Sequence, residues 1–265
     1  MTNVESFYDN NVENEWTRLD RHPLEYEITK KYLDKYINEK SNILDVGGGP
    51  GKYAFYLKKR GHCVSLLDLS AENINFAKIK AKEYNLELND YRHADVLDMS
   101  FVSDETFDVV LCLGPLYHLM DIKQRLRAIN ECLRVLRSDG LIFIAFINKF
   151  AQAVSLINGS PEKIIEWRSY FDQVIETGIN NGEVDSGFTD SYFFYPDEVE
   201  SLLDNFPLKK LVISGVEGLF AQSENKLKNL DKQLLEEWVN FSFKYASHPS
   251  ILGACQHILY IGKKI

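Results

Sequence analysis

The chain has 265 residues, a length that suits one large domain or two small ones. Hydrophobic residues make up 45% of it and charged residues 26%, and this balance excludes a wholly disordered or collagen-like chain. There are 30 Lys and Arg residues against 39 Asp and Glu residues, which gives a net charge of −9. Nucleic-acid binders mostly carry basic surfaces, because phosphate contacts dominate their affinity. The charge therefore argues against a nucleic-acid partner.

The sequence predicts a cytoplasmic protein with no membrane anchor. Residues 1–16 are polar and acidic and contain no apolar run of the kind found in secretory signals. The longest apolar run, Leu141–Ile147, is far too short to span a bilayer. The cysteines lie far apart without a Cys-x-x-Cys pair, so we expect reduced thiols and no metal site. They are Cys63, Cys112, Cys132 and Cys255.

The first helix is predicted to begin at Pro23, because proline suits a first helical position. Apolar residues then recur every fourth position from Leu24 to Tyr36 and mark one buried face. The polar segment before this helix carries aromatic residues, which are typical of a segment that docks on another surface. We expect residues 1–22 to form a mobile lid over a binding site.

From residue 42 onward, short apolar runs alternate with helical patterns. Ser70 and Asp121 stand where N-caps are expected, and Gly61 and Gly140 stand where helices are expected to end. Strict alternation predicts right-handed crossovers and an α/β fold with a doubly wound, mostly parallel sheet. The expected strands are 43–46, 64–69, 90–94, 107–113 and 141–147, with helices at 53–60, after Ser70 and from Asp121 to Gly140.

The alternation stops after residue 148. The pattern is helical over 151–180 and 196–205, and an apolar helical stripe runs from Leu227 to Tyr245. Strands are expected at 208–214 and 256–261. We expect one domain, made of an N-terminal arm (1–40), a core (41–148), helical insertions over the carboxyl edge of the sheet (149–190 and 219–250) and the end of the sheet (191–218 and 251–265).

A glycine-rich turn, GGGPG at 47–51, follows the first expected strand. Such a turn lets a ligand approach the backbone near a helix N-terminus. The dinucleotide pattern G-x-G-x-x-G fails here, because Lys52 stands where its third glycine belongs. Asp45 lies just before the turn, where a carboxylate suits an ammonium group better than a pyrophosphate. Both features disfavour a nicotinamide enzyme.

Two further acidic residues lie at the ends of the next strands. Asp68 ends the second expected strand and is placed to accept hydrogen bonds from both hydroxyls of a ribose. Asp95 follows the third, where it is placed to accept an amino proton from a purine while the next backbone N–H reaches a ring nitrogen. Together with Asp45, these residues describe an adenosine that carries an amino-acid tail and no phosphate.

These residues resemble those of the class I S-adenosylmethionine-dependent methyltransferases over roughly residues 40–148. The resemblance rests on ILDVGGGPG (43–51), SLLDLS (65–70), HADVLDM (93–99), ETFDVVLCLGPLYHL (105–119) and LRVLRSDGLIFIA (133–145). It implies a Rossmann-like sheet of seven strands, of which the last is antiparallel, and S-adenosylmethionine as the cofactor. The predicted cofactor-binding residues are Asp45, Gly47, Gly48, Gly49, Gly51, Asp68, Leu69, Asp95, Val96, Leu113 and Arg21.

Methyl transfer from a sulfonium is an in-line displacement, in which the protein positions the cofactor and the acceptor. A base is needed only where the acceptor must lose a proton, and His118 is either this general base or a structural histidine. Arg21 is expected to pair with the carboxylate of the cofactor. Tyr8, Tyr117 and Tyr192 are expected to contact the acceptor.

The leading hypothesis is therefore a methyltransferase that acts on a small molecule without a metal ion. One alternative is a methyltransferase of tRNA, rRNA or protein. Another is a cofactor-binding regulatory module without catalytic activity, because a fold does not determine a function. The sequence indicates neither the acceptor atom nor the oligomeric state.

Overall fold

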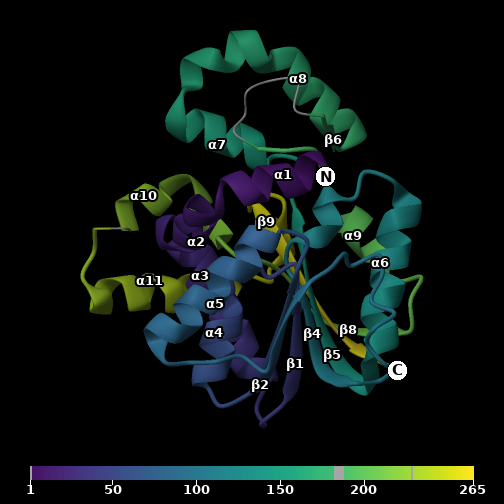
Figure 1. Ribbon diagram of the computed structural model, residues 1–265. Helices are drawn as coiled ribbons and strands as arrows, with labels where there is room; N and C mark the ends of the chain where they lie inside the picture. The colour runs from purple at the N-terminus through teal and green to yellow at the C-terminus, as the bar shows by residue number, and fades with distance from the viewer. Residues whose placement is uncertain (1, 182–187, 228) are drawn as a thin grey trace.

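The computed structural model describes residues 2–181, 188–227 and 229–265 and has a seven-stranded sheet at its centre (Figure 1). The strand order is β3-β2-β1-β4-β5-β9-β8, and β9 alone runs antiparallel to its neighbours. This is the predicted doubly wound sheet with an antiparallel last strand. The strands are β1 (Asn42–Val46), β2 (Cys63–Asp68), β3 (Asp90–His93), β4 (Phe107–Cys112), β5 (Leu136–Ile147), β8 (Leu208–Gly215) and β9 (His257–Lys264).

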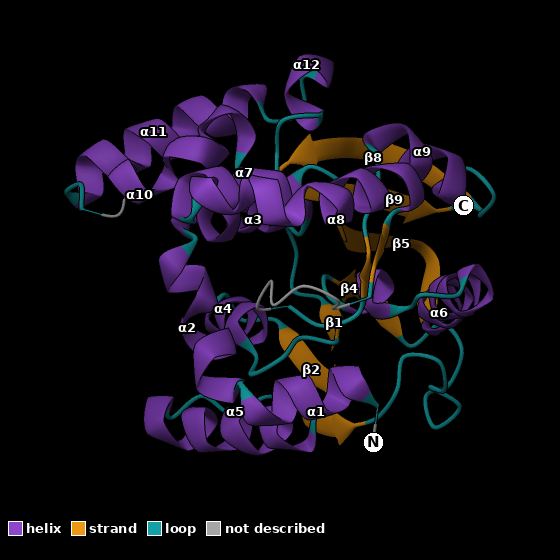
Figure 2. Cartoon of the chain, turned by 90° about the horizontal axis from the view of Figure 1, so that it is seen from above, coloured by secondary structure: helices purple, strands orange, loops and turns teal. Residues whose placement is uncertain are grey.

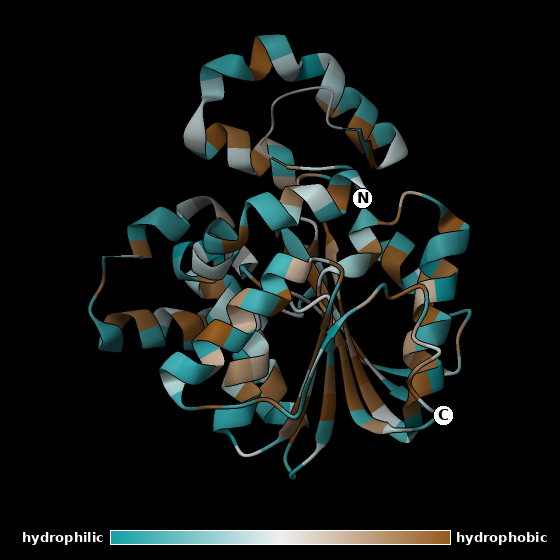
Figure 3. Cartoon of the chain, viewed as in Figure 1, coloured by the Kyte–Doolittle hydropathy of each residue, from teal (hydrophilic) through white to brown (hydrophobic). Residues whose placement is uncertain are grey.

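The register brings the carboxyl ends of the central strands to one edge of the sheet. Asp45 of β1 pairs with Leu66 of β2 and with Leu111 of β4. Asp68, the last residue of β2, pairs with His93, the last residue of β3. The central strands are apolar along most of their length (Figure 3), as strands covered on both faces must be. The loops that follow them therefore emerge side by side.

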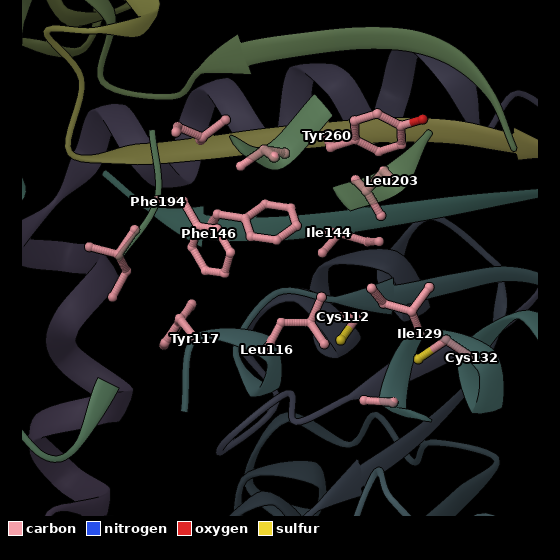
Figure 4. Close-up of a cluster of buried hydrophobic side chains, with 14 of the residues drawn as sticks. Cys112, Leu116, Tyr117, Ile129, Cys132, Ile144, Phe146, Phe194, Leu203 and Tyr260 are labelled. Atoms are coloured by element: carbon pink, nitrogen blue, oxygen red, sulfur yellow. The ribbon is translucent and has the colours of Figure 1, made fainter. Parts of the chain in front are cut away.

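Helices cover both faces of the sheet. On one face lie α3 (Pro23–Tyr36), α4 (Lys52–Lys59) and α5 (Ala71–Tyr84), and on the other lie α6 (Ile122–Val135) and α9 (Pro196–Leu203) (Figure 1). Each layer closes over its own group of buried apolar side chains. Figure 4 shows the core beneath α6 and α9, which includes Cys112, Ile129, Ile144, Leu203 and Tyr260.

The arm 1–40 contains three helices. Two of them, α1 (Asn3–Asn10) and α2 (Val12–Arg21), come before α3, which begins at Pro23 as predicted. The insertion 149–190 contains α7 (Ala151–Gly159) and α8 (Ile164–Thr177), which lie beyond the carboxyl edge of the sheet (Figures 1 and 2). Its smaller elements are η2 (Pro161–Lys163) and β6 (Ile179–Asn180), and β6 pairs with β7 (Ser191–Tyr192), which follows the insertion. In the core, the segment after β4 contains η1 (Pro115–His118).

The insertion 219–250 takes a different place. Its main helix, α11 (Lys232–Tyr245), packs along α3, where Phe243 meets Tyr32 with ring centroids 4.7 Å apart. This insertion therefore extends the helical layer beside the sheet. Its shorter elements are η3 (Gly218–Ser223), α10 (Glu224–Leu227) and α12 (Pro249–Leu252). Within the described ranges, no helix has both the length and the apolar character needed to cross a membrane.

The boundary between α6 and β5 differs from the prediction. Asp121 caps α6 as expected, its side chain accepting a hydrogen bond from the Lys123 amide. The helix ends at Val135, however, and Leu136 begins a strand that pairs with Phe107. Gly140 therefore lies in an irregular stretch of β5 and does not end a helix. A local apolar spacing cannot distinguish the last turn of a helix from the first residues of a strand whose partner lies elsewhere in the chain.

Candidate active site

A cavity of about 260 Å³ lies at the carboxyl edge of the sheet. Its walls come from the turn after β1, the end of β2, the loop after β3, the segment 113–119 after β4 and the helices α1 and α2. The predicted site residues that line it are Tyr8, Asp45, Gly47, Gly48, Gly49, Asp68, Leu69, Asp95, Val96, Leu113, Tyr117 and His118. The edge of an open parallel sheet is where such folds bind ligands.

The turn after β1 requires glycine for two separate reasons. Gly47 and Gly49 have φ angles of +63° and +56°, a region that L side chains rarely adopt. A Cβ atom on Gly47 would also lie 2.4 Å from Cγ of Pro115, which no side chain tolerates. The backbone of this turn is thus exposed directly to the cavity.

Asp68 is buried at the end of β2 and is held firmly by donors. Its Oδ2 accepts a hydrogen bond from the Gly49 amide at 2.7 Å. Its Oδ1 accepts hydrogen bonds from the Ser70 amide at 2.9 Å and from Nδ2 of Asn73 at 3.1 Å. Burial raises the pKa of Asp68, and these three donors oppose the rise. The carboxylate therefore has a fixed orientation at the wall of the cavity.

Asp45 is equally buried but has no such support. Within the described chain, neither of its carboxylate oxygens has a partner in hydrogen-bonding geometry. Burial, followed by repulsion from Asp68, raises the pKa of Asp45 to about 7, while the Ala54 amide opposes this only weakly. A buried carboxylate without a donor is costly unless a cationic ligand meets it. Asp45 is thus a ready partner for an ammonium group.

The N-terminal helices form one side of the cavity. On α1, Oδ1 of Asp9 accepts hydrogen bonds from Oγ of Ser70 at 2.5 Å and from the Glu72 amide at 3.3 Å, at the start of α5. On α2, Asp20 pairs with Nζ of Lys52 at 2.9 Å. Because these contacts join the arm to the two helices that follow β1 and β2, the arm and the cavity form one structural unit.

Tyr8 and His118 meet across the cavity. Oη of Tyr8 lies 2.7 Å from Nε2 of His118, and Nδ1 of His118 lies 3.0 Å from the carbonyl oxygen of Asp190. Burial lowers the pKa of His118 to about 4, so the imidazole is neutral at neutral pH. Burial also raises the pKa of Tyr8 well above its usual value. The pair is therefore a neutral hydrogen-bonded unit.

Arg18 of α2, which no sequence motif marks, also lines the cavity. Its guanidinium donates two hydrogen bonds to Glu25, at 2.7 and 2.8 Å, and one to Glu15 at 3.1 Å. Behind it, His257 contacts Glu217 and lies 3.8 Å from Glu25. Burial alone would lower the pKa of His257, but Glu25 and Glu217 raise it to about 9. A buried chain of alternating charges thus holds Arg18 in place.

Three predicted site residues do not line the cavity. Arg21 instead donates hydrogen bonds to Oγ1 of Thr17 and the carbonyl oxygen of Asn14. The ring of Tyr192 lies under the Arg125 guanidinium, 3.9 Å from its centre. Gly51 serves as the N-cap of α4. Arg21 and Tyr192 thus lie outside the wall of this cavity, and their contacts with the cofactor and the acceptor stay predictions.

Residues 44–144 match the methyltransferase domain family. This segment is a class I S-adenosylmethionine-dependent methyltransferase domain. The match covers the glycine turn, Asp45, Asp68, Asp95 and the loop that carries His118. The N-terminal arm and the insertions lie outside it, so the domain match says nothing about the lid or the acceptor side of the cavity.

Curated relatives of the methyltransferase domain share its core. The ubiquinone biosynthesis O-methyltransferase of Actinobacillus pleuropneumoniae is 32% identical over 143 residues, which are 49% of this chain and 58% of that protein. The protein of the same name from Vibrio atlanticus is 26% identical over 174 residues, which are 66% of this chain and 65% of that protein. The chain thus matches less than two thirds of the length of these relatives.

Solved structures share the fold over nearly the whole chain. A methyltransferase of Thermotoga maritima, described as a possible histamine N-methyltransferase, has a TM-score of 0.58 at 15% identity and covers 98% of this chain and 99% of its own. The 1,6-didemethyltoxoflavin-N1-methyltransferase of Burkholderia thailandensis was solved with S-adenosylhomocysteine. It has a TM-score of 0.57 at 14% identity, and the match covers 98% of this chain and 87% of that protein. At these identities the likeness establishes the architecture alone.

Proposed function

We propose that this protein is an S-adenosylmethionine-dependent methyltransferase that transfers a methyl group to a small-molecule acceptor. The buried, unpaired carboxylate of Asp45 beside the glycine turn is the observation that carries the proposal. A cofactor with an ammonium group would supply the missing partner. The names of the curated relatives support the same activity.

Other predicted cofactor residues also line the cavity. Asp68, already oriented by three donors, would accept hydrogen bonds from the ribose hydroxyls. Asp95 and Val96, in the loop after β3, would hold the adenine, and Leu113 would lie beside the sulfur. Arg18 takes the place predicted for Arg21 and is the candidate partner of the cofactor's carboxylate. When bound, the cofactor supplies a methyl group on a positively charged sulfur.

The arm supports a small acceptor. Helices α1 and α2 contribute Tyr8, Glu15 and Arg18 to the wall of the cavity, and the insertion lies beyond the same edge. A site closed in this way excludes water and admits a molecule of limited size. A base within an RNA or a side chain of a folded protein would need the arm to move away.

Calorimetric titration tests cofactor binding. We expect S-adenosylmethionine and S-adenosylhomocysteine to bind, and NAD to bind at least tenfold more weakly; tighter binding of NAD would overturn the proposal. Asp45→Asn is the informative variant, since it should weaken both adenosyl ligands without unfolding the protein. Methyl transfer from labelled cofactor to fractionated small metabolites, with tRNA and protein fractions as controls, tests the acceptor class. Binding without transfer to any fraction would indicate a regulatory module instead.

A further inference from the structure

The hydrogen bonds of His118 determine where its proton lies. The carbonyl oxygen of Asp190 only accepts, so Nδ1 of His118, 3.0 Å away, carries the hydrogen. A neutral imidazole then has a single lone pair, on Nε2, and the Tyr8 hydroxyl donates to it at 2.7 Å. The nitrogen that a direct general base would use is therefore already taken by Tyr8.

We propose that Tyr8 receives the proton of the acceptor and passes its own proton to His118, and that the acceptor group is a hydroxyl on a planar ring. This inference rests on the proposed methyltransferase function and assigns the acceptor class to the same cavity. Tyr8 lines the cavity together with His118, so its oxygen can accept a hydrogen bond from a bound ligand while it donates to Nε2.

The proposed step balances in atoms and charge. As the acceptor oxygen bonds to the methyl carbon, its O–H bond breaks and the proton joins Oη of Tyr8. The original proton of Tyr8 moves to Nε2 of His118. The carbon–sulfur bond breaks and its electron pair stays on sulfur, so the positive charge moves from sulfur to the imidazolium. The imidazolium then loses a proton to water when the product leaves.

The walls around the pair fit a planar ring. The ring centroid of His118 lies 5.4 Å from that of Tyr8, 4.7 Å from that of Tyr117 and 5.3 Å from that of Phe188. Phe7 contacts both Tyr8 and Phe188, with centroids 5.3 and 6.2 Å apart. Rings pack against such walls through their edges and faces. Of these residues, Tyr8, Tyr117 and His118 line the cavity, and Phe7 and Phe188 pack against Tyr8 and His118. Three aromatic rings in the cavity wall thus offer faces and edges to a planar acceptor.

The charges favour an uncharged acceptor. Among the described residues that line the cavity, the cations are Arg18 and Lys52, and carboxylates pair with both. Since Arg18 is also the candidate partner of the cofactor's carboxylate, a carboxylate or phosphate on the acceptor would find no further cation among these residues. The titratable groups that face Tyr8 and His118 are Tyr117, Glu15, Arg18, Asp68 and Asp190.

The weak basicity of His118 fits a hydroxyl better than an amine. With a pKa of about 4, His118 does not remove a proton from a resting alcohol or phenol. An oxygen that gains a methyl group while it still holds its proton becomes a far stronger acid than imidazolium, so the transfer is then favourable. A methylated amine is a weaker acid than this imidazolium and would keep its proton. The relay therefore assists a hydroxyl and not an amine.

Labelled S-adenosylmethionine with phenol, catechol and naphthol, and with aniline and naphthylamine, tests the inference. We expect the wild-type protein to methylate at least one hydroxyl probe and to prefer it over its amine counterpart. Tyr8→Phe should lower kcat by about 10²–10⁴-fold with little change in KM. His118→Ala should cost a similar factor, and the double variant should be no worse than either single variant, because the two residues act as a unit. Tyr245→Phe, on the exposed side of α11, is the matched control.

The outcomes separate the relay from the proposed function. Cofactor binding without transfer to any hydroxyl probe, or a Tyr8→Phe variant with unchanged kcat, overturns the relay. A Tyr8→Phe variant with a lower KM and normal kcat would show that Tyr8 merely blocks His118. Losses that multiply in the double variant would show independent roles and also overturn it. Failure to bind S-adenosylmethionine would instead overturn the proposed function.

The wild-type protein should also show a characteristic pH profile. Its kcat should stay constant from pH 8 down to about 5, because His118 stays neutral over that range.

Discussion

Asp45 and Asp68 lie at the carboxyl ends of neighbouring strands, yet only Asp68 is held by hydrogen bonds. Three donors fix Asp68, whereas Asp45 has no partner within the described residues. Repulsion from Asp68 also contributes to the raised pKa of Asp45. One carboxylate is thus preorganised for neutral hydroxyls, and the other is stabilised once a cation arrives. The two residues should therefore respond differently to substitution and to pH.

Replacing Asp68 should weaken binding of the cofactor directly. We expect Asp68→Asn to cost about 1–3 kcal/mol in the binding of S-adenosylhomocysteine, because the ribose loses its charged acceptor. Titration calorimetry measures the loss, and thermal melting shows whether the turn at Gly49 survives. Glu72→Ala, on the exposed start of α5, is the control. Equal affinity in the Asp68 variant and this control would exclude a ribose contact.

The pKa of Asp45 predicts a pH-dependent affinity. In the empty protein this pKa is about 7, so below pH 7 a proton must leave before the ammonium can pair with the carboxylate. The Kd of S-adenosylhomocysteine should therefore rise by up to about tenfold for each pH unit below 7 and level off above it. Asp45→Asn should bind weakly and without this pH dependence. A wild-type Kd that is constant from pH 5.5 to 8 would contradict the prediction.

The same substitution should stabilise the empty fold. A buried carboxylate without a donor destabilises the folded state when it is ionised, and the neutral amide introduced by Asp45→Asn would remove that charge. We expect this variant to melt at a higher temperature than the wild type at pH 8. The difference should shrink as the pH falls through 7 toward 4, because Asp45 is then protonated in the folded state and increasingly also in the unfolded state. Melting curves without ligand at both pH values provide the measurement.

The buried pair of His257 and Glu217 predicts a loss of stability in base. The folded pKa of His257 is about 9 and lies above its ordinary value of 6.5. The contribution of His257 to the free energy of unfolding is therefore complete below about pH 6.5. It disappears as the pH rises through 9, a change of order 2–3 kcal/mol. Urea unfolding at pH 6.5, 8 and 9.5 should show this decline in the wild type.

A variant isolates the contribution of His257 from other groups that titrate in base. In His257→Gln the decline should be smaller by the same amount, about 2–3 kcal/mol. If that variant does not fold, NMR titration of the His257 ring in the wild type provides the test instead. A His257 that titrates near its ordinary pKa would contradict the prediction.

Ligand binding should protect the arm. Because Tyr8, Glu15 and Arg18 line the cavity, hydrogen exchange over α1 and α2 should slow when S-adenosylhomocysteine binds. Asp9→Ala removes the contacts of α1 with Ser70 and the Glu72 amide and should speed exchange in α1 even without ligand. Glu39→Ala, in the exposed loop after α3, is the control. Equal exchange with and without ligand would show that the arm is not a lid.

Local sequence was sufficient to predict an element wherever the residues of that element alone determine its structure. The continuous apolar run of β4 predicted a central parallel strand, and Asp121 predicted the start of α6. The end of α6 was predicted too late, because the pairing of Leu136 with Phe107 is a contact between distant segments. Arg21 was chosen over Arg18, three positions away on the same helix, because only the packing of α2 decides which of them faces the cavity.

The sequence by itself determined the cofactor side of the cavity. Parallel strands bring their carboxyl ends to one edge, so residues that end strands, such as Asp45 and Asp68, must meet there whatever the rest of the chain does. The sequence also offered Tyr8 and His118 as candidates for the acceptor side, but only the tertiary structure decided that the two residues meet. Tyr8 and His118 lie 110 positions apart, and His257 reaches Glu25 from the last strand. Such pairs depend on how the arm docks on the sheet, and that docking is fixed by long-range packing, which local periodicity does not encode.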